Sequence, residues 1–151
     1  MDIRFSLRGR GWLDATVSVR GRSVSLTGSY LSEPLKDLLG GLLASVDAGR
    51  CTASRWITEP GELRLSLIPA SEELGIRVVE FEDVTSADLP EAEQGDVIFD
   101  EVCPTRDFVA AVLEGVKQLL DDVGGEGEYV HQWGGEAFPA TTIDALRERA
   151  A

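Results

Sequence analysis

The sequence predicts an α+β fold, in which one antiparallel sheet of about six or seven strands carries two amphipathic helices on one face. Several segments alternate apolar and polar residues with the period of a half-buried strand. Two segments carry apolar stripes at the period of a helix. The expected order along the chain is three strands, a helix, four strands and two helices, and consecutive strands joined by short turns are typical of antiparallel pairing.

Alternation places the first three strands at residues 2–8, 13–20 and 23–30, joined by turns that contain glycine. After the first helix, strands are expected at residues 50–58, 63–67, 74–82 and 96–103. The strand at 74–82 has apolar residues on both faces, which indicates a central or covered position. The three-strand meander should have one face rich in Ser, Thr and Arg exposed to solvent, and the other packed under the helix.

The clearest helix spans residues 32–49. Ser32 is a suitable N-cap, Pro34 is tolerated in the first turn, and Gly49 fits the left-handed position that ends many helices. Gly40 and Gly41 lower the intrinsic helix propensity. Either packing of the apolar stripe overrides them, or the backbone approaches a neighbour closely at this point. The stripe consists of Leu35, Leu38, Leu39, Leu42, Leu43 and Val46.

A second helix should begin with Thr105 as its cap and end at Gly124 and Gly125. Residues 126–139 are expected to be irregular, with a short strand at 129–133, and a final helix should occupy residues 139–149. Residues 126–151 would pack on a single domain that spans residues 1–151. If the helices seal the sheet, Leu39→Asp and Val116→Asp should each unfold the domain.

The composition is that of a globular chain of 151 residues. No apolar run approaches the length of about 18–20 residues that a membrane span needs. The first residues show no basic region followed by an apolar stretch, so we expect a cytoplasmic protein. Cys51 and Cys103 should be free, buried thiols, although a disulfide between them stays open. The oligomeric state is not indicated.

The sequence contains none of the common catalytic or nucleotide-binding motifs, so we expect a protein that is not an enzyme and needs no cofactor or metal. Its single histidine, His131, lies in an aromatic stretch with Tyr129 and Trp133. An alternative function is therefore binding of a small ligand or a metal in a pocket near these three residues.

Charge is distributed unevenly along the chain. Residues 1–77 hold 10 Lys and Arg against 9 Asp and Glu, whereas residues 78–151 hold 4 against 18. A negative field repels nucleic acid and attracts a basic protein surface, although it can also serve solubility alone. We expect a basic partner to contact the acidic residues Glu80, Glu82, Asp83, Asp88, Glu91 and Glu93.

Two tryptophans, Trp12 and Trp56, fall on the polar side of their strands by alternation. They could anchor the same partner surface, because buried aromatic residues dominate many interfaces. The other interpretation is that the C-terminal segment covers this face and buries them.

Five stretches follow one another along the chain, GRGWLDATVSV, SEPLKDLL, TEPGELR, VIFDEVC and QWGGEAFP. In this order they resemble an uncharacterised bacterial family of short acidic proteins. The resemblance covers most of the chain. It implies no activity and no catalytic residues. The function that we expect is thus an interaction domain, immunity-like or inhibitory, for a basic partner.

Overall fold

The computed structural model describes residues 1–83, 95–134 and 136–150, and this part of the chain forms two antiparallel sheets and four helices. Sheet A has the strand order β1-β2-β3, and sheet B has the order β4-β5-β6-β7. Sheet A contains β1 (Asp2–Leu7), β2 (Trp12–Val19) and β3 (Arg22–Ser29), and sheet B contains β4 (Thr52–Ile57), β5 (Glu62–Ala70), β6 (Glu73–Phe81) and β7 (Asp96–Pro104). The helices are α1 (Pro34–Ala48), α3 (Thr105–Val123), α4 (Glu126–Trp133) and α5 (Ala140–Ala150).

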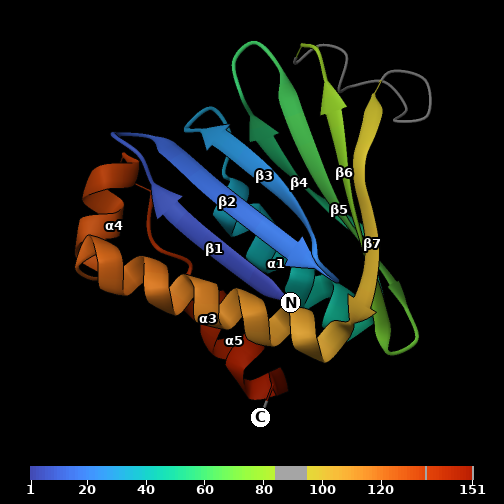
Figure 1. Cartoon of the computed structure of the whole chain (residues 1–151). Coiled ribbons are helices and arrows are strands. Elements are labelled where there is room, and N and C mark those ends of the chain that lie inside the picture. The colour runs from blue at the N-terminus through green and yellow to red at the C-terminus, as the bar shows by residue number, and fades with distance from the viewer. Residues whose placement is uncertain (84–94, 135, 151) are drawn as a thin grey trace.

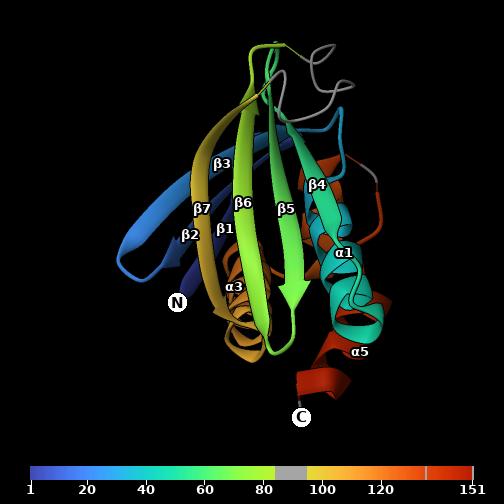
Figure 2. The same ribbon diagram turned by 90° about the vertical axis from the view of Figure 1, so that its right-hand side faces the viewer.

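The α+β class and the antiparallel pairing are confirmed, but the prediction of a single sheet is wrong. Figures 1 and 2 show the two sheets inclined to each other, with α3 along β1 and α1 beside β4. The chain leaves sheet A through α1 and does not resume pairing with β3. Trp56 of β4 packs against Gly28 of β3, where a Cβ would lie 3.3 Å from the indole ring. The two strands therefore meet through side chains and are not hydrogen-bonded neighbours.

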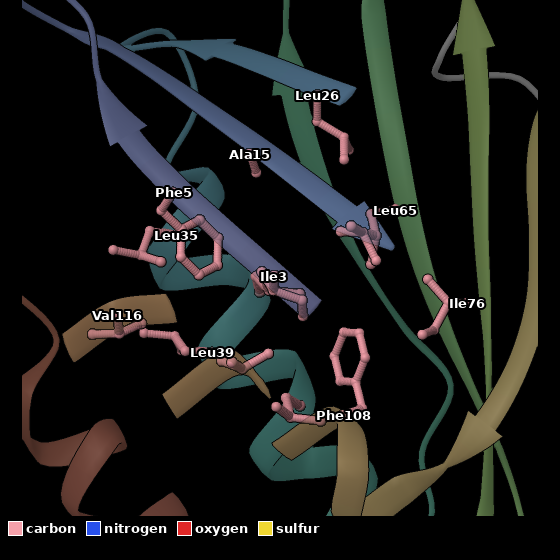
Figure 3. Packing of buried hydrophobic residues seen from close by; sticks show 14 of the residues in the cluster. Ile3, Phe5, Ala15, Leu26, Leu35, Leu39, Leu65, Ile76, Phe108 and Val116 are labelled. Carbon is pink, nitrogen blue, oxygen red and sulfur yellow. The ribbon is translucent and has the colours of Figure 1, made fainter. Parts of the chain in front are cut away.

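One hydrophobic core joins both sheets to the helices. Figure 3 shows Ile3 and Phe5 of sheet A, Leu39 of α1, Ile76 of sheet B and Phe108 of α3 converging on the space between the layers. Each of these side chains is at most 5% exposed. Burial of such a side chain contributes about 1.5–3 kcal/mol, so this core is the main stabilising feature of the fold.

The helix predicted at residues 32–49 is present as α1, and its two glycines differ. Nothing lies within 4 Å of a Cβ added at Gly40. A Cβ added at Gly41 would lie 2.7 Å from Thr52 Oγ1, so α1 approaches β4 closely at Gly41 alone. Gly49 takes the predicted left-handed C-cap conformation, with a φ of 62°.

Both predicted N-caps are wrong. Glu33 is the N-cap of α1 and Pro104 that of α3, and neither makes a side-chain capping bond. The hydroxyl of Ser32 instead donates to the Ser29 carbonyl at 3.2 Å and accepts from the Ile57 backbone N–H at 3.3 Å. Ser32 thus ties the start of α1 to both sheets, a long-range role that outweighs local capping.

A second close approach joins α3 to sheet A. A Cβ added at Gly115 would lie 2.6 Å from the Ile3 carbonyl oxygen and 3.2 Å from the ring of Phe5. Only glycine allows α3 to lie this close to the backbone of β1.

The C-terminal segment differs from the prediction, because residues 126–133 form the helix α4 and not an irregular stretch with a short strand. Tyr129 and Trp133 are four residues apart, so they share one helical face, and both are 2% exposed. The final helix is present as α5, and Arg149 binds Asp47 of α1 through two hydrogen bonds of 2.8 and 3.0 Å. Residues 126–150 thereby pack on α1 and α3.

Candidate functional site

Exposed carboxylates gather where β6 ends and β7 begins, at the upper end of sheet B in Figure 1. We call Glu80, Glu82, Asp83 and Asp96 the acidic end of sheet B. The side chain of each is exposed. The predicted contact residues Asp88, Glu91 and Glu93 lie outside the described residues.

The strand register brings two of these acids face to face. Glu80 of β6 is the direct cross-strand partner of Asp96 of β7. Carboxylates in this relation repel each other, because directly opposite side chains in an antiparallel pair have Cβ atoms about 4.5–5.5 Å apart. No ion pair within residues 1–83, 95–134 and 136–150 joins Glu80, Glu82 or Asp96 to a basic side chain. The negative charge of Glu80, Glu82 and Asp96 is therefore directed to solvent.

Further along β7 the carboxylates are paired with arginines. Asp100 Oδ2 lies 3.3 Å from Arg77 Nη2 on β6, and Glu101 Oε1 accepts from Arg22 Nη1 at 2.9 Å. Arg22 belongs to sheet A, so the second pair links the β2–β3 hairpin to β7. The described carboxylates of β6 and β7 are thus divided by the fold into a group paired with arginines and the acidic end of sheet B.

β7 also exposes apolar side chains. Val97 is 57% exposed, Ile98 41% and Val102 39%, while Phe99 and Cys103 of the same strand are buried. A register shift between Val78 and Val79 of β6 leaves Ile98 without a cross-strand partner, which marks a β-bulge in β7. Acidic and apolar side chains are consequently interleaved on one exposed strand.

A buried carboxylate that sequence reasoning missed lies at the same end of sheet B. Glu62, which lies just before the strand predicted at residues 63–67, is in β5 and is fully buried. Its two oxygens accept from Arg55 Nε at 2.8 Å and from Arg64 Nη2 at 3.3 Å. Arg55 and Arg64 are directly opposite each other in the β4–β5 register, so Glu62 screens two like charges. The guanidinium of Arg64 also lies 4.9 Å from the centre of the Phe81 ring.

The two candidate anchor tryptophans do not join the acidic end. Trp56 is fully buried between the sheets, and its indole N–H donates to Ser54 Oγ at 3.0 Å, so its role is in the core and not at a surface. Trp12 is half-buried in the other sheet, 5.7 Å beneath the guanidinium of Arg8. Alternation identified the faces of these strands, but it could not show that the face of β4 is covered.

The alternative ligand site is not assembled as predicted. Tyr129 and Trp133 are buried on one side of α4, whereas His131 is exposed. The Trp133 indole N–H donates to Glu33 Oε2 at 3.1 Å, and burial raises the pKa of Glu33 above its ordinary value. Burial likewise raises the pKa of Tyr129. These groups fix α4 against the start of α1, a structural role.

The described residues also offer little for metal or thiol chemistry. Among them, no group of three or more His, Cys, Asp and Glu is placed to hold a metal ion. Both cysteines are free, but Cys51 is exposed, contrary to expectation, and Cys103 is buried. Burial raises the pKa of the Cys103 thiol to about 11, so it is a poor nucleophile at neutral pH.

A cavity of about 760 Å³ lies at the opposite end of sheet B from the acidic end, between the C-terminus of α1 and the N-terminus of α3. Glu72 and Glu73 line it together with Arg106. The three side chains are exposed and of mixed sign, so they do not define one ligand chemistry.

Comparison of the chain with protein-family models, curated proteins and solved structures finds no match. None of the helices in the described ranges has both the length and the hydropathy to cross a bilayer. The interpretation of the site therefore stands on its geometry alone.

Proposed function

We propose that this protein is a non-enzymatic interaction domain that binds a basic partner protein through the acidic end of sheet B. The observation that carries the proposal is the facing pair Glu80 and Asp96, exposed and without a basic partner in the part of the chain that the structure describes. Holding like charges opposite each other costs the free protein about 0.2–1 kcal/mol. A cation placed between the two carboxylates by a partner would reverse the sign of this energy.

The long-range field supports the same function. The formal net charge is −13, which accelerates encounter with basic proteins and disfavours nucleic acid. An immunity-like or inhibitory role fits such a surface, because covering a basic functional site of another protein requires only complementary charge and shape. Solubility is the competing explanation, and it assigns no special role to the acidic end.

Two triple variants with the same change in charge separate these explanations. The first reverses Glu80, Glu82 and Asp96 to Lys, and the second reverses Glu114, Asp121 and Asp122 of α3, which are also exposed. Affinity capture from a lysate of the source organism is performed at low ionic strength, where charges act over about 10 Å or more. We expect the wild type and the α3 variant to retain one basic protein that the first variant does not retain. Equal capture by all three proteins would reject the proposal.

A further inference from the structure

β7 is an edge strand, and no strand among the described residues pairs with its outer edge. It lies last in sheet B and pairs with β6 on one side only. Outside the helices and sheet ladders, none of the backbone hydrogen bonds among the described residues involves residues 96–104. Figures 1 and 2 show β7 at the margin of sheet B in both views. An edge strand of this kind presents unpaired N–H and C=O groups to an incoming chain.

The other three sheet edges are covered. β1 packs along α3 with the close contact at Gly115, and β4 packs along α1 with the close contact at Gly41. β3 lies against β4. β7 meets sheet A at the β2–β3 hairpin, through the pair of Glu101 with Arg22. This contact is between side chains, so among the described residues the backbone edge of β7 from Asp96 to Val102 is the accessible template.

The side chains on the outer face of β7 define what could pair with it. The strand register pairs Val97, Asp100 and Val102 with Val79, Arg77 and Gly75, so these three side chains of β7 share one face of sheet B. Phe99 and Cys103 lie on the opposite face and are buried. This face reads apolar, acidic, apolar. An added strand would match it with an apolar residue, a Lys or Arg, and a second apolar residue at alternate positions.

The same features argue against a second copy of this chain as the occupant. Charged residues on an edge are a common protection against self-pairing. Two copies would each carry a formal charge of −13 and would bring their acidic strands together. A basic segment turns this repulsion into attraction, so charge complementarity selects the partner.

We propose that β7 receives an extended segment of the basic partner as an additional strand of sheet B, with apolar residues on either side of a Lys or Arg. This inference rests on the proposed function and specifies its mode of binding. The incoming cation would reach Asp100 through Oδ1, since Oδ2 faces Arg77, and further basic residues would extend to Asp96 and Glu80.

The test uses a defined peptide probe and NMR of the full chain. The probe has seven residues, with lysine first, fourth and last, valine second and sixth, and serine elsewhere. A control peptide replaces the serine after the central lysine by proline, which removes a ladder donor. On addition of the probe, we expect changes in amide chemical shift and slower amide hydrogen exchange that are confined to β7 and the strands beside it. The proline peptide should bind about tenfold more weakly, the loss that corresponds to one ladder hydrogen bond.

Protein variants complete the test. Val97→Lys removes an apolar contact and adds a positive charge that repels the basic probe, so affinity for the probe should fall about tenfold. The matched control is Leu31→Lys, which changes a residue that is 54% exposed between β3 and α1 and should alter affinity less than about twofold.

The outcomes separate the two proposals. If charge reversal of the acidic end weakens probe binding, but the proline in the peptide and Val97→Lys in the protein do not, the partner binds by surface charge and strand addition is wrong. Absence of β7 shifts at saturating probe also rejects strand addition. If charge reversal has no effect on any basic ligand, the proposed function itself fails.

Discussion

Neighbouring glycines in α1 should respond to the same substitution with opposite signs. Gly40→Ala places a Cβ in open space on an exposed helical position, so it gains the full difference in helix propensity, about 0.8–1 kcal/mol. In a chain of this size that gain raises Tm by about 2–4 °C. Gly41→Ala gains the same propensity but brings its Cβ to 2.7 Å from Thr52 Oγ1 and 3.1 Å from Thr52 Cβ.

Thr52 cannot easily move away. Its Cβ is fixed by the backbone of β4, and its hydroxyl lies 3.4 Å from Ser45 Oγ. Overpacking of this kind costs about 1–3 kcal/mol, so Gly41→Ala should lower the stability by about 1 kcal/mol net. Thr52→Ala removes the nearest atom, and in that background the cost of Gly41→Ala should fall by at least half.

The assay is urea unfolding of the wild type, the single variants and the double variant, read as a double-mutant cycle. A coupling free energy near zero between positions 41 and 52, together with equal stabilisation by both alanines, would show that α1 does not approach β4 as described. That result would also remove the reason why β4 is a covered edge and β7 an open one.

Four further predictions concern buried residues and the thiols. Glu62→Gln should destabilise the fold by about 3 kcal/mol in urea unfolding. This is the lower end of the range for a broken buried ion pair, because Arg55 is 41% exposed. The control Glu80→Gln should have little effect on stability or a small stabilising one. Val116→Asp should abolish the cooperative transition in thermal unfolding, because this side chain is 1% exposed in the core; retention of the wild-type Tm would contradict the packing of α3. Iodoacetamide at pH 8 should label the exposed Cys51 and not the buried Cys103 in the native protein, as measured by mass spectrometry. Labelling of Cys103 in preference to Cys51 would contradict the burial described. Burial raises the pKa of Cys103 in the folded protein from 9.0 to about 11. The stability contributed by its protonated thiol is therefore complete below pH 9 and is lost as the pH rises to 11. Over this pH range the wild type should lose more stability than the variant Cys103→Ala.

Local patterns in the sequence located all seven strands of the described chain, because alternation is a property of each strand alone. They did not reveal that the strands divide into two sheets, because alternation identifies which face of a strand is buried but not which strand lies beside it. The two sheets meet where Trp56 packs against Gly28, and these two residues are far apart in the sequence. α4 was missed because its aromatic and β-branched residues resemble a strand, although the spacing of Tyr129 and Trp133 was a helical signal.

The candidate site, like the fold, was predictable from the sequence only in its local features. The sequence identified the acidic stretch, and the structure shows where it is exposed. The neutralisation of Glu101 depends on Arg22, 79 positions away, and no local pattern could indicate this pair. The burial of Glu62 was hidden because its neighbours Pro60 and Gly61 are typical turn residues, while its two arginines are supplied by the pairing of β4 with β5.

The most direct test of the account is the affinity of the captured partner for the wild type and for each of the two triple charge-reversal variants, measured by calorimetry at low ionic strength. Exposed ion pairs contribute about 0.2–1 kcal/mol each, so reversing Glu80, Glu82 and Asp96 should cost about 0.6–3 kcal/mol and weaken binding roughly 3- to 150-fold. The triple reversal in α3 should change the affinity less than about threefold, since only the long-range field differs. Equal weakening by both triple variants would show that net charge, and not the acidic end of sheet B, determines binding.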